Sequence, residues 1–262
     1  MKNKRYIILN TVGLILTVVI NYLSNTGIFY GNTMKTVSDA YFTLFTPAGY
    51  AFSIWGIIYL GLASFIVYSG RHVFRGIDPL RAVERIGSWF FISCLANMFW
   101  VVAWLNHYTL LSVLLMVILL VSLLRIVSKL ELSLRKVSVK NYVFIALPFS
   151  LYAGWISLAI IANVAALLTK YRWDGFGLTE ETWALIMIAI AGMVNIGMVL
   201  KRNMKAYGAV GMWALLAVAA NQNADALYII YACYVFSALV FLAILFNFFR
   251  PTRLKDNNAF HS

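Results

Sequence analysis

Residues 109–128 read TLLSVLLMVILLVSLLRIVS, and this stretch decides the fold class. Within it only Arg125, close to the end, carries a charge. A helix needs about 17–25 mostly apolar residues to cross the hydrocarbon core of a bilayer, which is about 30 Å thick. The stretch meets that length without interruption, so it predicts a transmembrane helix.

Similar apolar runs lie on both sides of residues 109–128, separated by short polar segments. The sequence therefore predicts an all-α fold, a polytopic transmembrane helix bundle of about eight spans. The weakest run is the seventh, because it is short and ends in the polar residues 221–225. The expected spans are 6–24, 47–69, 88–106, 109–128, 143–168, 182–200, 206–221 and 226–249.

The composition supports the same class. Of the 262 residues, 63% are hydrophobic and only 11% are charged. A soluble domain of this size needs far more charge to cover its surface. Cys94 and Cys233 both lie inside apolar runs, so we expect reduced packing residues rather than a disulfide or a metal site.

Positive charge is distributed according to the positive-inside rule. With the N-terminus placed in the cytosol, every Lys and Arg except Lys35, Lys170 and Arg172 falls in a cytosolic segment. We therefore expect an integral protein of the plasma membrane with both termini in the cytosol. The net charge of +12 then sets topology and contacts anionic lipid head groups, so membrane lipids are expected partners. Nucleic-acid binding is not expected, because these loops lack interleaved aromatic residues.

Ionisable side chains are confined to loops and span ends, which argues against proton-coupled or ion-coupled transport. The histidines His72, His107 and His261 are far apart in the sequence, so no metal site is expected. His107 could ligate a haem iron, although a lone histidine at the membrane interface is more often simply hydrogen-bonded. No GxSxG, HExxH or glycine-rich phosphate loop is present. We expect neither catalysis nor a required cofactor.

Aromatic and amide side chains recur at helical spacing in the second, third and fifth expected spans. Within each span the chosen residues are three, four or eight positions apart and share one helix face. Indole and phenol rings would stack on a flat ligand, while amides would fix its orientation. The candidate ligand-binding residues are Trp55, Tyr59, Asn97, Trp100, Trp155 and Asn163.

Depth along the helices places Trp55, Asn97 and Asn163 in the outer half of the bilayer. At a rise of about 1.5 Å per residue they lie roughly 12, 13 and 8 Å from the outer ends of their spans. The long outer segment 25–46 either folds down over them as a lid or rests on lipid head groups. An amide in hydrocarbon must find a partner, so the alternative function of these side chains is to hold the helices together.

Three motifs resemble the TspO/MBR family of translocator proteins and tryptophan-rich sensory proteins. Residues 45–59, FTPAGYAFSIWGIIY, resemble the proline-containing entry to the family's second helix and its W-x-x-x-Y motif. Residues 95–100, LANMFW, resemble its L-N-x-x-W motif with one residue inserted. Residues 155–163, WISLAIIAN, match its W-x-S-x-A-x-x-x-N motif at the same spacing.

The resemblance implies a five-helix bundle over residues 1–170, which encloses a pocket for tetrapyrroles, sterols or similar ligands beneath the first loop. Residues 171–262 would be a C-terminal extension of about three transmembrane helices and a short cytosolic tail. The resemblance also favours a homodimer. We predict a membrane-embedded binding protein or sensor for a flat hydrophobic small molecule, with a tetrapyrrole as a candidate ligand.

Two alternatives remain at this point. One is a transporter of a neutral or hydrophobic small molecule, in which the last three spans move or form a dimer surface. Gly208 and Gly211 could allow close helix packing there. The other is an enzyme acting on a lipid or tetrapyrrole through Tyr59 or His107.

Overall fold

The computed structural model describes residues 2–75, 81–134 and 137–249, and the predicted cytosolic tail from residue 250 onward lies outside them. Within the described ranges the chain forms helices joined by loops, without a strand. The helices are α1 (Lys2–Leu23), α2 (Met34–Ala40), η1 (Gly49–Ser53), α3 (Ile54–Arg75), α4 (Arg81–Ile86), α5 (Trp89–Leu105), α6 (Thr109–Lys129), α7 (Val139–Asn141), η2 (Tyr142–Ala146), α8 (Leu147–Lys170), η3 (Gly175–Gly177), α9 (Glu180–Arg202), α10 (Lys205–Ala220) and α11 (Leu227–Phe249).

Apolar helices lie at the positions of the expected spans, and the all-α polytopic bundle is confirmed. The helical segments that contain α1, α3, α6, α8, α9 and α11 are long and apolar enough to cross a membrane. α5 and α10 are shorter, with 17 and 16 residues. At 1.5 Å per residue each extends for about 25 Å, less than the bilayer core. The number of spans therefore stays a prediction.

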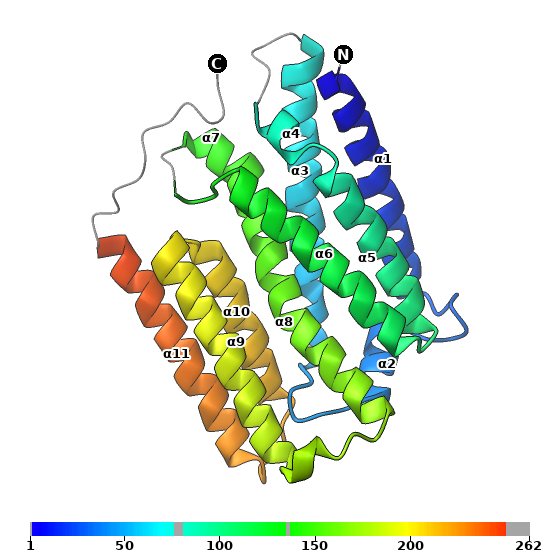
Figure 1. The fold of residues 1–262 in the computed structure, drawn as a ribbon, viewed down its shortest axis with the longest axis vertical. Helices are drawn as coiled ribbons and strands as arrows, with labels where there is room; N and C mark the ends of the chain where they lie inside the picture. The colour runs from blue at the N-terminus through cyan, green and yellow to red at the C-terminus, as the bar shows by residue number, and fades with distance from the viewer. Residues whose placement is uncertain (1, 76–80, 135–136, 250–262) are drawn as a thin grey trace.

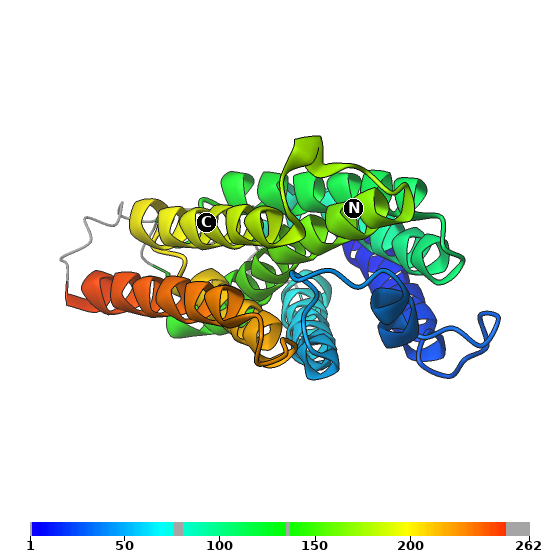
Figure 2. The same ribbon diagram turned by 90° about the horizontal axis from the view of Figure 1, so that it is seen from below.

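The helices form two regions that lie side by side (Figure 1). In the five-helix region, α1 contacts α3 and α5, α6 contacts α5 and α8, and α3 contacts α8. In the three-helix region, α9, α10 and α11 all contact one another. The regions meet mainly where α10 lies against α8. Seen from below, α1 and α11 lie on opposite sides of the molecule (Figure 2).

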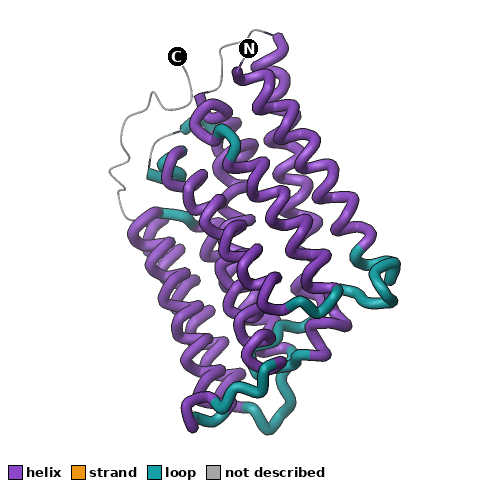
Figure 3. The backbone as a smooth tube through the Cα atoms, turned by 45° about the vertical axis from the view of Figure 1, so that its right-hand side comes forward, coloured by secondary structure: helices purple, strands orange, loops and turns teal. Residues whose placement is uncertain are grey.

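The two ends of the bundle carry different connections. The long first loop and the connection between α8 and α9 lie at the same end, the lower one in Figures 1 and 3. The start of α1 and the end of α11 both point toward the other end. This arrangement places the start and the end of the described chain at the same end of the bundle, as expected for a protein with both termini on one side of the membrane. That this side is the cytosol stays a prediction.

The second span begins later than the sequence predicts. A helix is expected from residue 47, but Ala48 has extended dihedral angles (φ −58°, ψ 148°) and a 3₁₀ turn, η1, leads into α3 at Ile54. The Ala48 N–H donates to the carbonyl oxygen of Ala217 in α10 at 2.8 Å, which holds this backbone outside the helix. Trp55 consequently lies in the first turn of α3 rather than two turns inside it.

Glycines allow close approach where α10 meets its neighbours. A Cβ atom at Gly154 of α8 would lie 2.9 Å from the carbonyl oxygen of Tyr207 in α10, so the two backbones are nearly in contact. Cβ atoms at Gly208 and Gly211 would overlap side chains of α9 in the same way. The close packing expected at Gly208 and Gly211 is therefore confirmed.

Candidate functional site

An aromatic cluster surrounds Trp55 at the start of α3. The Trp55 ring stacks on Tyr59 with ring centroids 5.3 Å apart, and Trp100 of α5 lies 6.1 Å away. Tyr152 and Trp155 of α8 meet it edge-on at 5.8 and 6.3 Å. These separations are typical of favourable aromatic pairs. The structure thus brings together four of the six predicted residues, while Tyr152, three residues before Trp155, was missed.

Asn97 lies at the centre of a buried polar network. Its Oδ1 accepts hydrogen bonds from Asn21 Nδ2 at 2.9 Å and from the Tyr59 hydroxyl at 3.5 Å. Its Nδ2 donates to the Tyr152 hydroxyl oxygen at 2.8 Å. Asn97 therefore links α1, α3, α5 and α8, and the network gives a buried amide the partners that it needs.

Asn163 joins the next set of helices. The Trp100 indole N–H donates to Asn163 Oδ1 at 3.2 Å, and Asn163 Nδ2 donates to the Ser112 hydroxyl at 2.9 Å. Since these side chains come from α5, α8 and α6, the amide connects three helices. All three are buried.

A cavity of about 50 Å³ lies next to these residues, beneath the first loop. Of the predicted residues, Trp100, Trp155 and Asn163 line it, whereas the other three are absent from its walls. This volume is far below the roughly 300–1,000 Å³ of small-molecule sites, so a larger ligand needs the walls to move. The lining residues are Met34, Ser38, Tyr41, Thr46, Pro47, Phe52, Trp100, Trp104, Met116, Trp155, Ala159, Ala162, Asn163 and Ala166.

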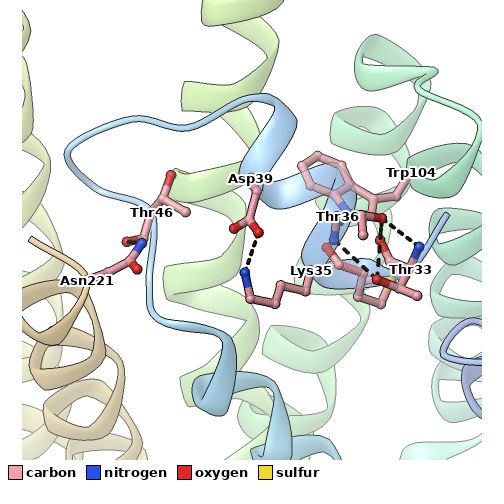
Figure 4. A network of polar contacts seen from close by, with 8 residues as sticks. Thr33, Lys35, Thr36, Asp39, Thr46, Trp104 and Asn221 are labelled. Atoms are coloured by element: carbon pink, nitrogen blue, oxygen red, sulfur yellow. Dashed lines mark hydrogen bonds and ion pairs between the residues drawn. The ribbon is translucent and has the colours of Figure 1, made fainter.

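The first loop covers this cavity with the short helix α2. Reciprocal side-chain and backbone hydrogen bonds between Thr33 and Thr36 cap the start of α2 (Figure 4). On one side Trp104 of α5 donates its indole N–H to the Met34 carbonyl oxygen at 3.5 Å. Since several residues of α2 and the following segment line the cavity, the loop occupies the position of a lid.

The other side of the lid is held by α10 and the residues just after it. Asn221 lies beside Thr46 in Figure 4. The Trp213 ring also meets Tyr50 edge-on at 5.1 Å. Sequence reasoning missed these contacts, because the acceptors are main-chain carbonyl groups that any residue type provides. The hydrogen bonds to the lid segment are Ala48 N to Ala217 O (2.8 Å), Trp213 Nε1 to Ala51 O (3.3 Å), Asn221 Nδ2 to Thr46 O (3.1 Å) and Gln222 Nε2 to Leu44 O (3.2 Å).

His107 is hydrogen-bonded through both ring nitrogens. Asn32 Nδ2 donates to the Leu105 carbonyl oxygen at 2.8 Å and lies 3.3 Å from His107 Nε2. An amide nitrogen only donates, so Nε2 accepts, and Nδ1 donates to the Tyr41 hydroxyl at 2.9 Å. His107 thus has the hydrogen bonds expected of a histidine at the membrane interface. Burial raises the pKa of the Tyr41 phenol.

A family model described as TSPO-like protein matches residues 7–246. The chain belongs to the TSPO-like family. The matched segment runs from α1 into α11, and it includes both helix regions. The predicted resemblance is therefore confirmed, and the chain is an integral membrane protein of the TspO type. No curated protein and no solved structure shows a significant match.

In this TSPO-like protein one cavity wall carries an unused hydrogen-bond donor. The Trp155 indole N–H is buried and has no acceptor among the described residues. An unsatisfied buried donor costs about 1–3 kcal/mol. Trp55 has the same unpaired N–H, but it lies outside the cavity lining. Trp155 is therefore a cavity-lining residue whose indole N–H is unpaired.

Proposed function

We propose that this TSPO-like protein is a binding protein or sensor for a flat hydrophobic ligand, such as a tetrapyrrole or a sterol, and has no catalytic activity. The observation that supports this most is an aromatic cavity enclosed by α5, α6 and α8, with the unpaired Trp155 N–H in its wall. Aromatic walls suit a flat apolar body, and a few polar groups orient it.

The six predicted residues take two roles in this proposal. Trp100 and Trp155 stack on the ligand, and Asn163 holds the Trp100 indole in place through its hydrogen bond. Trp55, Tyr59 and Asn97 form the layer behind these residues and keep α3, α5 and α8 in register. The Tyr41 hydroxyl adds a second donor on the lid side.

Ligand entry in this proposal requires the lid to move. The cavity of about 50 Å³ is too small for a tetrapyrrole or sterol, and α2 with the following segment forms the wall that comes from the first loop rather than from a long helix. Trp104 holds the lid at one side and α10 holds it at the other. Displacement of the lid would therefore be felt by the three-helix region, which is how binding could be reported as a signal.

The setting of the site follows the charge pattern. We propose that the protein resides in the plasma membrane among its lipid partners, with both termini in the cytosol. The cavity then faces the outer half of the bilayer, and no cofactor is needed for binding.

The test is quenching of tryptophan fluorescence in the purified full chain by protoporphyrin, by haem and by a fluorescent sterol. We expect saturable quenching with at least one of them, and its loss in the Trp100→Leu/Trp155→Leu double variant. Trp89→Leu is the matched control, because Trp89 lies at the opposite end of α5 from Trp104 and outside the cavity lining. Unchanged affinity in a folded double variant would refute the assignment.

A substitution at Trp155 alone tests the role of the indole N–H. Trp155→Phe replaces the indole by a smaller phenyl ring, which keeps an aromatic face and lacks the N–H. A ligand that accepts a hydrogen bond should lose about tenfold in affinity, equivalent to about 1.4 kcal/mol. A ligand analogue without an acceptor at that edge should bind wild type and Trp155→Phe alike.

A transporter of a neutral or hydrophobic small molecule is the second candidate. One observation favours it: Thr46 and Pro47 line the inner cavity, while residues 42–44 line a second cavity described below. Residues 42–47 thus contribute to the walls of both cavities, and a movement of this segment would join the two cavities. Flux of ligand into sealed proteoliposomes separates the two functions, because a sensor binds without net transfer.

A further inference from the structure

A second and larger cavity of about 460 Å³ opens at the end of the bundle that carries the long first loop. Residues 42–44 form one wall, and Leu168 and Thr169 at the end of α8 form another. The remaining wall comes from residues 172–175 and from the start of α9. Its volume falls within the range of small-molecule sites. The cavity lies at the junction of the two helix regions, with walls from both.

Two indole rings form a rigid side of this cavity. The ring centroids of Trp173 and Trp183 are 4.9 Å apart, with planes inclined by 56°. Trp183 Nε1 donates to the Gly175 carbonyl oxygen at 2.7 Å. Gly175 has a φ of +68°, and a Cβ atom there would lie 3.0 Å from Trp183 Nε1. Glycine is therefore needed for the turn that fixes the indole.

Charged side chains of both signs line the same cavity. Asp174 and Glu180 are exposed carboxylates, and Arg172 is an exposed guanidinium. Within the part of the chain that the structure describes, none of the three has an ion-pair partner. Asp174 is held in place because its Oδ1 accepts the Phe176 N–H at 3.1 Å.

The combination selects a particular ligand chemistry. Indole faces beside carboxylates attract an ammonium group, through cation–π and Coulomb interactions. Arg172 favours a phosphate or carboxylate, which a guanidinium binds with paired N–H groups. Leu168 and Met187 provide an apolar floor for hydrocarbon. A ligand that uses all of these features carries an ammonium and an anionic group close together on an apolar body.

We propose that this outer cavity binds a zwitterionic phospho-ammonium group, of the kind found in phosphocholine and phosphoethanolamine. The ammonium lies against Trp173 and Trp183 beside Asp174 and Glu180, and the phosphate lies at Arg172. The site is separate from the inner cavity and does not depend on the function proposed for it. Either a lipid head group of the adjacent leaflet or a free zwitterion could supply this chemistry.

The test is binding to the purified full chain in a maltoside detergent, measured by isothermal titration. The probes are a short-chain phosphatidylcholine, the phosphatidylglycerol with the same chains, and soluble phosphocholine. We expect phosphatidylcholine to bind about tenfold more tightly than phosphatidylglycerol, because only the former carries the cation. Equal affinity for these two lipids would overturn the proposal.

Variants connect binding to the named residues. Glu180→Gln should weaken phosphatidylcholine binding about tenfold. The matched control, Glu181→Gln, should leave it unchanged, since Glu181 is the next residue of α9 and does not line the cavity. Arg172→Gln should weaken phosphatidylcholine and soluble phosphocholine alike. Equal effects of Glu180→Gln and Glu181→Gln in folded proteins would refute the site.

The soluble probe identifies the source of the ligand. If phosphocholine binds as tightly as phosphatidylcholine, the site accepts a free zwitterion. If only the lipid binds and Glu180→Gln abolishes the preference over phosphatidylglycerol, the ligand is a lipid head group. Both results support the proposed chemistry.

Discussion

The two helix regions hold their helices together in different ways. In the five-helix region, Asn97 and Asn163 connect helices through side-chain hydrogen bonds to hydroxyl, amide and indole groups. In the three-helix region, Gly192, Gly208 and Gly211 allow neighbouring side chains to reach the helix backbone, and Asn247 of α11 adds a side-chain hydrogen bond to the Val199 carbonyl oxygen of α9. Lipid supplies little hydrophobic force between helices, so close packing and interhelical hydrogen bonds of this kind contribute to holding them together.

The inner cavity lies in the five-helix region, next to the residues that these hydrogen bonds connect. The polar network joins the helices around the aromatic rings and gives both the oxygen and the nitrogen of the Asn97 amide a partner. Glycine contacts bring the backbones of α9, α10 and α11 close to neighbouring side chains. α10 takes part in both arrangements, because it is closely packed on α9 and also holds the lid of the five-helix region.

The largest effect is expected where the two regions join. Gly154→Leu places a side chain against the backbone of Tyr207, where even a Cβ atom would lie 2.9 Å from the carbonyl oxygen. α10 must then move away from α8, and we expect a loss of about 3 kcal/mol in the free energy of unfolding. Thermal unfolding in detergent, followed with a thiol-reactive dye, measures this.

The two buried cysteines tell which region unfolds first. Cys94 reports on α5 and Cys233 on α11, each in a variant whose other cysteine is alanine. In Gly154→Leu, Cys233 should become reactive at a lower temperature than Cys94, because the three-helix region loses its main attachment. The control is Gly197→Leu, where a Cβ atom meets nothing within 4 Å. Equal melting of both glycine variants would contradict the prediction.

An intermediate loss of stability is expected when a residue of the polar network is replaced. Asn97→Leu removes the hydrogen-bond partner of the Tyr152 hydroxyl and leaves Asn21 Nδ2 with only the Thr17 carbonyl oxygen, and we expect a loss of about 2 kcal/mol. Asn10→Leu is the matched control on α1, since both amide atoms of Asn10 are buried without a hydrogen bond. The control should be neutral or stabilising. Equilibrium unfolding in mixed micelles compares them, and equal destabilisation would show that the network contributes nothing.

The smallest effect is expected at the lid. Trp213→Phe keeps an aromatic ring near Tyr50 and removes the N–H that donates to Ala51. We expect a loss of less than about 1 kcal/mol in global stability. Amide hydrogen exchange of residues 44–51 should nevertheless become faster. Trp89→Phe, distant on α5, should leave that exchange unchanged; identical exchange in both variants would mean that α10 does not restrain the lid.

Parts of the candidate site could be predicted because they depend on helix periodicity. Trp55 with Tyr59, and Trp155 with Asn163, lie at helical spacing in α3 and α8. In the structure Trp55 contacts Tyr59 and Trp155, and Asn163 binds the Trp100 indole. Tyr152 was within reach of the same reasoning, being three residues from Trp155. Asn21 was not, because nothing in the spacing of α1 indicates that it faces Asn97.

The sequence by itself determined the membrane class, the positions of the apolar helices and the family. Each of these depends on properties of consecutive residues, such as a run long enough to cross a bilayer or a motif within one helix. Only the tertiary structure decided which of the predicted residues line the inner cavity, that α10 restrains the lid, and that Trp173 and Trp183 meet beside three charges. These depend on how the helices are rotated against one another and on main-chain acceptors, and main-chain carbonyl groups are the same in every residue.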